Sequence, residues 1–341
     1  MKPTVHDIAS RAGVSLATVD RVLNRRPGVS ARTREKVDQA VSELGFVRDV
    51  AAANLAKGRV YPLTFLIPSN DNSFMRGLRL ALQEASARAS VDRIAIRLID
   101  VPAFDAPALA AALREAARQE PAGIAFVAVD APEVAEAAAE ISAAGIPLVT
   151  LVSDLSGTDR DHYAGIDNTA AGRTAASLLG RFAGGRQGKV CVLAGSMLVR
   201  DHRERCDAFA SVMAADYAGL DLLPVLEGRD DPVAVERLVS ELFSKRDDIV
   251  ALYSLGAGNR GLIKALERLP KARRPVVIAH ELTDTTRDAL QSGLIDAVLN
   301  QDAGHEVRSA IRVLKAKADG LPVVAAQERI RIDIFLKDNL P

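Results

Sequence analysis

From residue 60 onward, continuous apolar runs alternate with amphipathic, alanine-rich stretches. The apolar runs have the length and composition of buried β-strands and lie at 62–67, 94–99, 123–129, 146–152, 189–194, 248–254, 275–279 and 295–300. The stretches between them predict helices, among them 74–89, 132–144, 169–183, 203–215, 232–245 and 303–318. Apolar strands that alternate with helices are typical of parallel sheets covered on both faces. Because residues 60–341 are too many for one ordinary sheet, we expect an α/β domain of two doubly wound lobes.

The first 46 residues have a different pattern, typical of a small all-α helix-turn-helix domain. Thr4 and Asp7 have the spacing of a capping box, Gly13 suits a left-handed turn, and Ser15 can cap a second helix. A third helix is expected after Ser30. The residues expected to share the core are Ile8, Ala9, Ala12, Val14, Val19, Val22, Leu23, Val37, Ala40, Val41 and Leu44. An ordinary helical hairpin shows some of these signals, but here capping, turn and core spacing coincide.

Charge divides the chain at the same place as the hydrophobic pattern. The first 59 residues hold 11 Lys/Arg against 6 Asp/Glu, whereas the whole chain is balanced at 44 against 44. A basic segment on a neutral protein indicates that this segment meets a polyanion such as DNA.

The remaining composition gives no indication of catalysis, a metal or a cofactor. Cys191 and Cys206 fall in predicted core elements, and the five histidines lack metal-ligand spacing. No Gly-x-Ser-x-Gly elbow occurs, and GGRQGK at 184–189 precedes a strand instead of following one. No apolar run has the length of a membrane span, and the N-terminus has no signal-like segment. We therefore expect a cytoplasmic protein that is not an enzyme.

The head also carries a long motif. Residues 7–24 read D-I-A-x-x-A-G-V-S-x-x-T-V-x-R-V-L-N, followed by VSARTREKV and ELGF. This pattern resembles the LacI/GalR family of bacterial transcription regulators. The resemblance implies a homodimeric, ligand-controlled repressor that binds pseudo-palindromic operator DNA, with an effector domain like the periplasmic sugar-binding proteins.

In that family the second helix enters the major groove, which assigns roles to residues here. Leu16 and Ala17 occupy the specificity positions, and Arg21 is the long-reach reader of a base edge. Arg21 can bond guanine through two hydrogen bonds, a contact that discriminates by about 1–3 kcal/mol. Further DNA-binding candidates, several of them phosphate contacts, are Thr4, Ser15, Thr18, Asn24, Arg25, Arg32 and Thr33.

Asp20 departs from the family, which usually has Ser there. Its carboxylate either accepts a bond from a cytosine or pairs with a neighbouring Arg, or else it pairs with Asn24 or is simply solvated. Both interpretations stay open at this point.

Residues 47–59 resemble the family's hinge helix, with Asp49 as a possible N-cap. So short a helix would fold only against DNA and a second copy. Leu55 matches the leucine that wedges into a central base step. Arg48 replaces the family's proline, and Ala53 replaces a hinge arginine, so a weaker grip is expected.

These patterns predict three domains: a DNA-binding domain at 1–46, a hinge at 47–59 and an effector-binding domain at 60–341. The first lobe is expected to comprise about 60–164 and 302–327, and the second about 165–301 and 328–341. Crossings near Gly165, Gln301 and Glu328 would leave a ligand cleft at the carboxyl ends of the strands.

Effector contacts are expected in the loops that follow the strands. Arg203 matches an arginine that clamps ligand in many sugar-responsive members, and Ser153 replaces a charged contact that simple-sugar binders carry. The other candidates are polar or aromatic: Asn70, Asp71, Asn72, Phe74, Asn259, His280, Glu281 and Gln301. They predict a sugar, a polyol or a sugar acid as the effector. Several also suit turns or caps, and Arg203 could pair with Glu204 or Asp207.

One motif suggests a different ligand. Gly256 to Gly261 read G-x-G-x-x-G after a strand, with Glu281 twenty residues further on, as in dinucleotide-binding sites. A nucleotide-sensing repressor is thus an alternative, as is a small-molecule binding protein without regulatory DNA binding.

Overall fold

The chain forms two compact units, Met1–Arg59 and Val60–Pro341. A computed structural model describes residues 3–24, 26–46, 54, 58–69, 72–157 and 159–341. We refer to residues 1–59 as the head and to residues 60–341 as the body. The hinge residues Arg48, Asp49, Ala53 and Leu55 lie outside the described residues, so the expectations for them stay predictions.

The head contains three helices, α1 (Val5–Ala12), α2 (Leu16–Leu23) and α3 (Ala31–Leu44). Thr4 and Asp7 form the predicted capping box, with the Thr4 amide donating to the Asp7 carboxylate at 2.7 Å. Gly13 ends α1 with a φ of 65°, a conformation that favours glycine, and Ser15 caps α2 by accepting from the Thr18 amide. The chain thus encodes the sharp connection between α1 and α2 locally.

A small core holds these helices together. Its fully covered members come from all three helices: Ile8, Ala9, Val19, Val22, Val37 and Ala40. The other residues expected in this core pack against it and are partly buried: Ala12, Val14, Leu23, Val41 and Leu44. So small a unit has little apolar area to bury, and its helix caps therefore matter more to its stability.

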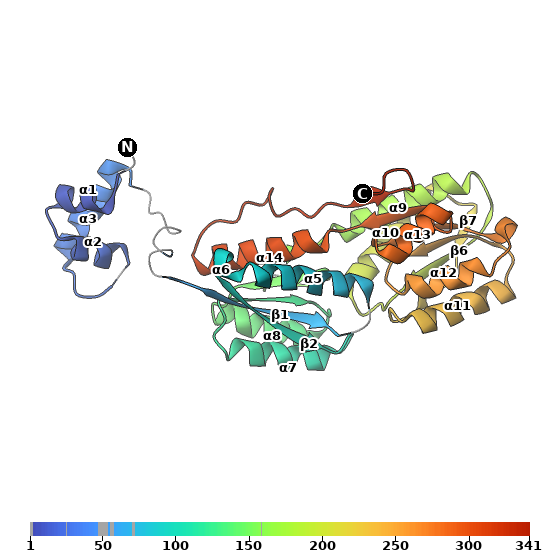
Figure 1. The fold of residues 1–341 in the computed structure, drawn as a ribbon, viewed down its shortest axis with the longest axis horizontal. Coiled ribbons are helices and arrows are strands. Elements are labelled where there is room, and N and C mark those ends of the chain that lie inside the picture. The colour runs from blue at the N-terminus through green and yellow to red at the C-terminus, as the bar shows by residue number, and fades with distance from the viewer. Residues whose placement is uncertain (1–2, 25, 47–53, 55–57, 70–71, 158) are drawn as a thin grey trace. The chain divides into compact units, whose positions relative to one another are not determined.

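The first lobe of the body is a five-stranded parallel sheet. Its strands are β1 (Tyr61–Pro68), β2 (Ile94–Val101), β3 (Gly123–Val127), β4 (Leu148–Leu151) and β5 (His162–Ala164), in the order β2-β1-β3-β4-β5. One face packs on α5 (Ser73–Ala87) and α14 (Ala303–Ala318), and the other on α7 (Ala106–Ala117) and α8 (Pro132–Ala143). Figure 1 shows this three-layer arrangement, with the short α6 (Ala89–Asp92) beside α5.

The second lobe is built on a seven-stranded sheet in the order β12-β11-β10-β9-β6-β7, with β8 pairing with β6. Its strands are β6 (Gly188–Ala194), β7 (Leu220–Leu222), β8 (Leu226–Glu227), β9 (Ile249–Ser254), β10 (Val276–His280), β11 (Ala297–Asn300) and β12 (Asp333–Phe335). Helices α9 (Asn168–Ala183) and α10 (Arg200–Asp216) cover one face. The other face packs on α11 (Pro232–Lys245), α12 (Asn259–Glu267) and α13 (Asp284–Ser292). A short 3₁₀ turn, Lys271–Arg273, precedes β10.

The chain passes between the two sheets three times. It leaves β5 for α9 at 165–167, leaves β11 for α14 at 301–302, and returns to β12 through 319–332. The carboxyl ends of the parallel strands in both lobes therefore meet at one cleft. The predicted fold class, a helical head and a two-lobed α/β body, is confirmed.

The sequence did not predict the short strands at the margins of the sheets. β5, β7, β8 and β12 have two or three residues each, too few to show a periodic pattern. They exist because a neighbouring strand offers free backbone groups, which only the tertiary fold provides. No helix among the described residues is long and apolar enough to cross a membrane.

Candidate functional site

The outer face of α2 carries the predicted base readers. Leu16 is 41% exposed, and Ala17 and Arg21 are also exposed, whereas Val19 and Val22 on the opposite side enter the core. Within the part of the chain that the structure describes, the Arg21 guanidinium makes no hydrogen bond or ion pair. This face therefore offers a long cation and two small apolar contacts to a partner.

In the absence of DNA, Asp20 makes both protein contacts that the sequence suggested, one with a neighbouring Arg and one with Asn24. Its carboxylate accepts from the Asn24 amide at 2.7 Å and pairs with Arg26 at 3.1 Å. The carboxylate is thus held by its own helix and the following turn, and a bond to cytosine stays a prediction. These bonds also engage the side chain of Asn24, a predicted phosphate contact.

The other predicted DNA contacts lie at the helix starts. Thr4, Ser15 and Arg32 are exposed, and the hydroxyls of Thr18 and Thr33 bond those of Ser15 and Ser30 at the caps of α2 and α3. Arg25 lies outside the described residues.

The main pocket of the body lies in the cleft between its two lobes. The walls come from the carboxyl ends of β1 to β4 on one side, and from the N-terminus of α10 and the loops after β8, β9 and β10 on the other. Seven predicted effector residues line it: Asn72, Phe74, Ser153, Asn259, His280, Glu281 and Gln301. Asn70 and Asp71 lie outside the described residues.

Arg203 is absent from the lining of this pocket, which corrects the expectation that it would contact ligand there. Its guanidinium pairs with Asp130 of the first lobe and donates to the carbonyls of Met197 and Leu198 at 3.0 and 3.1 Å. The neighbouring Arg200 donates to the carbonyl of Leu155, also across the cleft. Arg203 therefore joins the two lobes at the rim.

Arg205 lines the pocket instead, because two positions along α10 rotate a side chain by about 200°. It is 2% exposed, and it donates to Asn168 Oδ1 at 2.8 Å and to the carbonyl of Leu255 at 2.9 Å. Its Nη2 bonds none of the residues that the structure describes and lies 4.0 Å from Asp201. The sequence did not lead us to predict Arg205 as a pocket residue. The spacing of Arg203 and Arg205 in RDHRER, which places them on different faces of a helix, could have indicated it.

Glu281 and Gln301 meet where the chain leaves the second lobe. Gln301 donates to the Glu281 carboxylate through its side-chain amide at 2.9 Å and through its backbone amide at 3.2 Å. Burial raises the pKa of Glu281 to about 7, although Arg205 and the bonds from Gln301 act in the opposite direction. A crossing segment is thus tied to a carboxyl group that titrates near neutral pH.

His280 is fully buried beside Glu281 and pairs with Tyr253, whose hydroxyl lies 2.8 Å from the His280 Nε2. Burial lowers the pKa of His280 well below its usual value, so the ring is neutral at pH 7. Its Nδ1 makes no hydrogen bond to any described residue and lies 3.9 Å from Glu281 Oε1.

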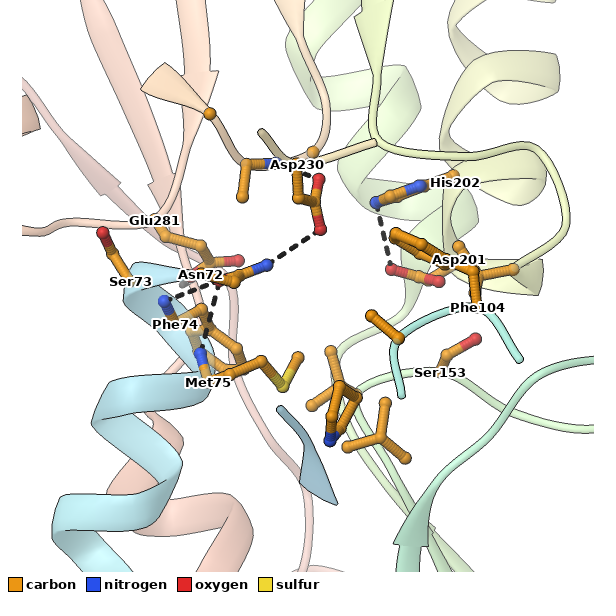
Figure 2. A pocket seen from close by; sticks show the side chains of 18 of the residues that line it. Asn72, Ser73, Phe74, Met75, Phe104, Ser153, Asp201, His202, Asp230 and Glu281 are labelled. Carbon is orange, nitrogen blue, oxygen red and sulfur yellow. Dashed lines mark hydrogen bonds and ion pairs between the residues drawn. The ribbon is translucent and has the colours of Figure 1, made fainter. Parts of the chain in front are cut away.

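Asn72 and Asp230 connect the lobes inside the cleft. Asn72 Nδ2 donates to Asp230 at 2.8 Å, while its Oδ1 caps α5 by accepting from Phe74 and Met75 (Figure 2). Asp230 also accepts from the Ala257 amide at 2.9 Å. Asn72 therefore links α5 of the first lobe to Asp230 of the second.

Several backbone positions around the pocket are strained. Four of its non-glycine residues have positive φ, between 57° and 69°: Phe104, Val152, Asp230 and Glu281. Such conformations persist only where the surroundings impose them, and they often mark ligand sites.

Packing explains the glycines of the G-x-G-x-x-G motif. Gly258 has a φ of 92°, and a Cβ at Gly261 would lie 1.9 Å from the Pro232 carbonyl oxygen. A Cβ at Gly256 would lie 2.6 Å from the Gly195 amide. Asn259 bonds Ser254 and the His280 carbonyl, which fixes the loop. Both cysteines are buried and free, and no cluster among the described residues has the makings of a metal site.

Comparisons with known proteins match both units. Residues 63–322 match the periplasmic binding protein domain, and residues 4–49 match the bacterial regulatory proteins of the lacI family. The lactose operon repressor of Escherichia coli is 51% identical over 57 residues, 16% of each chain. The HTH-type transcriptional regulator DegA of Bacillus subtilis is 36% identical over 84 residues, 25% of each chain. The match thus spans about a quarter or less of these curated relatives.

Solved structures resemble the body. A glucose-galactose binding protein from Geobacillus stearothermophilus aligns with a TM-score of 0.73 and 21% identity over 83% of this chain and 99% of that one. A solute binding protein from Burkholderia graminis in complex with D-arabinose gives a TM-score of 0.73 and 19% identity over 83% and 97%. At these identities the likeness shows a shared fold.

Proposed function

We propose that this chain, which belongs to the periplasmic binding protein family and carries a lacI-family regulatory domain at its N-terminus, is a ligand-responsive, sequence-specific transcription repressor. The proposal rests on two features that occur together in this chain, one in the head and one in the body. An unpaired arginine stands on the exposed face of α2, and the body holds a cleft with buried polar atoms that lack partners. The first feature suits DNA and the second a small polar ligand.

On operator DNA, α2 lies in the major groove. Arg21 bonds a guanine edge, while Leu16 and Ala17 contact thymine methyl groups. Thr18, Arg25, Arg32 and Thr33 bind phosphates and set the register. The surplus of five positive charges in the head supplies the salt-dependent part of the affinity.

In the cleft, a sugar or polyol meets the unpaired atoms. Arg205 Nη2 and His280 Nδ1 offer nitrogens, and Asp201 Oδ1 and Gln301 Oε1 offer acceptors. A hydroxyl both donates and accepts, so a polyhydroxylated ligand satisfies groups of either kind. Leaving them unpaired in a closed cleft would cost about 1–3 kcal/mol for each group.

The active species is a homodimer on a pseudo-palindromic operator. β2 is an edge strand of the first lobe, and exposed apolar residues lie on it and on the helices before it: Leu80 on α5 (57%), Val91 on α6 (78%) and Leu98 on β2 (38%). Edge strands are normally covered, and a second copy of the same face would cover this one symmetrically.

Ligand controls DNA binding through the angle between the lobes. Closure changes the spacing of the two hinge segments of a dimer and hence their joint grip on the operator. Couplings of this kind amount to about 1–3 kcal/mol, or roughly 5- to 150-fold in affinity. Because operator DNA is its target, the protein acts in the cytoplasm, and it catalyses no reaction.

Binding-site selection from random duplex DNA tests the proposal. The full-length protein is expected to enrich one pseudo-palindromic sequence, and gel shifts at fixed salt should then show at least about a thousandfold preference over scrambled DNA. Enrichment of no sequence would refute the regulator. Thermal shifts with sugars, polyols and nicotinamide cofactors, run in parallel, separate the proposed effector class from a dinucleotide.

A further inference from the structure

We propose that the effector is amphipathic: an uncharged, hydroxyl-bearing end binds the second lobe, and an alkyl or aryl group binds the first. This inference rests on the proposed function, since it takes the cleft as the effector site. It narrows the ligand from sugars in general to molecules that carry an apolar substituent, such as alkyl or aryl glycosides.

The described part of the wall from the first lobe is mostly apolar. Its lining side chains include Leu66, Phe74, Met75, Phe104, Leu109 and Val152. Among the described residues of this wall, which leave out 70–71, only Asn72, Ser73 and Ser153 are polar. Asn72 Oδ1 caps α5 and one Nδ2 hydrogen goes to Asp230, while the Ser73 hydroxyl accepts from Arg76 at 2.9 Å. Of these three described residues, Ser153 is the one with a buried oxygen that makes no hydrogen bond.

The wall from the second lobe has the opposite character. Asp201, Arg205 and His280 line it, each at most 5% exposed and each with a buried polar atom that lacks a partner. Gln301, at the crossing between the lobes, adds a fourth such atom. Figure 2 shows Asp201 and His202 across the open centre from Phe74 and Met75; Phe104 of the first lobe lies on the side of Asp201, and Glu281 of the second lobe lies on the side of Phe74. A ligand that is polar all round would leave hydroxyl groups unpaired against the first lobe, at a cost in affinity.

Charge indicates that the polar end is uncharged. Arg205 and Arg260 are the cations of the lining, and Asp201, Asp230 and Glu281 are its acids. Arg205 lies 4.0 Å from Asp201, so its charge is already partly balanced. A carboxylate ligand would meet these acids without a surplus of cations, which disfavours a sugar acid.

The apolar wall determines how much a substituent on the ligand should raise its affinity. Each methylene group that moves from water into such a surface improves affinity by about fourfold, and a phenyl ring by at least about tenfold. A series of ligands with one polar end and different substituents therefore measures the wall directly.

Isothermal titration calorimetry with the full-length protein suits this test, because the chain contains no tryptophan to report binding. The probes are glucose and galactose with their methyl, propyl and phenyl β-glycosides. We expect affinity to rise in the order free sugar, methyl, propyl, phenyl in at least one of the two sugar series. Equal or tighter binding of the free sugars, or binding by none of the probes, would overturn the inference.

Two matched variants show where the substituent binds. Phe104→Ala removes a half-buried ring from the apolar wall and should reduce the phenyl-to-methyl affinity ratio about threefold or more. Phe182→Ala removes a ring on α9 that is 40% exposed and absent from the lining, and should leave the ratio as it is. An unchanged ratio in Phe104→Ala, with thermal unfolding still cooperative, contradicts the assignment.

The experiments distinguish a failure of the amphipathic effector from a failure of the proposed regulator. If free sugars bind best and still alter the gel shift, the amphipathic effector is wrong and the regulator stands. If no operator sequence is enriched, the proposed function fails whatever binds in the cleft.

Discussion

At Glu281, a buried carboxyl group, a left-handed backbone and two bonds from Gln301 coincide. Arg205 and Asp201 are the charged groups of α10 that act on this carboxyl, and Glu306 of α14 faces it from the first lobe. Burial raises the pKa of Glu281 to about 7 and that of Glu306 well above its usual value. Individual side chains at the junction of the lobes therefore respond to pH.

Glu281 makes the stability of the body depend on pH in a defined direction. Its folded pKa of about 7 exceeds the 4.5 of an ordinary glutamate, so its favourable contribution is complete below pH 4.5 and is lost as the pH rises through 7. As the pH rises, the free energy of unfolding should fall by up to about 3 kcal/mol less in Glu281→Gln than in the wild type, because the variant lacks this titrating group. Glu306 should account for the pH dependence that remains. Urea unfolding between pH 5 and 8 measures the free energy of unfolding. If this free energy depends on pH in the same way in the wild type and the variant, the assignment is contradicted. Glu241→Gln, at an exposed site paired with Lys245, is the matched control.

Arg21 accounts for most of the base readout expected of the head. Arg21→Ala should reduce the preference for the selected operator over scrambled DNA by roughly 10- to 100-fold, because the bidentate guanine contact is lost. Competition gel shifts measure the ratio. Arg32→Ala, a proposed phosphate contact, should weaken binding to both DNAs alike and reduce the salt slope by about one. Unaltered selectivity in Arg21→Ala would show that another residue reads the operator.

At the scale of elements, α10 joins the lobes and lines the cleft with different faces. Arg200 and Arg203 reach across to the first lobe, whereas Asp201 and Arg205 line the pocket. Closure of the lobes and ligand contact are therefore coupled through one rigid helix.

The pair of Arg203 and Asp130 should favour the closed arrangement of the lobes. Because the pair is partly exposed, Arg203→Ala should weaken effector binding only about two- to fivefold. Titration calorimetry measures the change. Arg114→Ala breaks a comparable pair with Glu140 inside the first lobe and should leave effector affinity intact. Equal losses in both variants would argue against a role in closure.

Close packing of α12 against α11 depends on Gly261. A Cβ at this position would lie 1.9 Å from the Pro232 carbonyl oxygen and 2.8 Å from the Glu236 amide, so Gly261→Ala should destabilise the body by at least about 2 kcal/mol. Gly77→Ala is the matched control in α5, where the added Cβ would meet Ala303 at an ordinary 3.6 Å. It should stabilise the body by up to about 1 kcal/mol. Chemical denaturation compares the two, and a shift in the same direction for both would refute this account.

For the whole molecule, the proposed dimer is the feature that makes operator binding bivalent. The double variant Leu80→Asp, Leu98→Asp should be monomeric by analytical ultracentrifugation and bind the operator about a hundredfold more weakly, since each head then binds alone. Phe182→Asp, which places the same charge on another exposed apolar residue, should stay dimeric. A dimeric double variant would move the interface elsewhere.

The sequence by itself determined the three helices of the head and the long strands and helices of the body. Thr4, Gly13 and Ser15 fix the head through contacts within a few residues, and the alternation of apolar runs with helices indicated two parallel sheets. It also indicated that residues after the strands would gather in a cleft, and Asn72, His280 and Gln301 do line one.

Only the tertiary structure decided how that cleft is built. The choice of Arg205 over Arg203 depends on which face of α10 meets the sheets, and the short edge strands depend on their neighbours. The pairing of Asn72 with Asp230 joins residues 158 positions apart, beyond the reach of any local pattern. Which polar atoms stay unpaired, and why one wall is apolar, follow from contacts that the folded chain alone brings together.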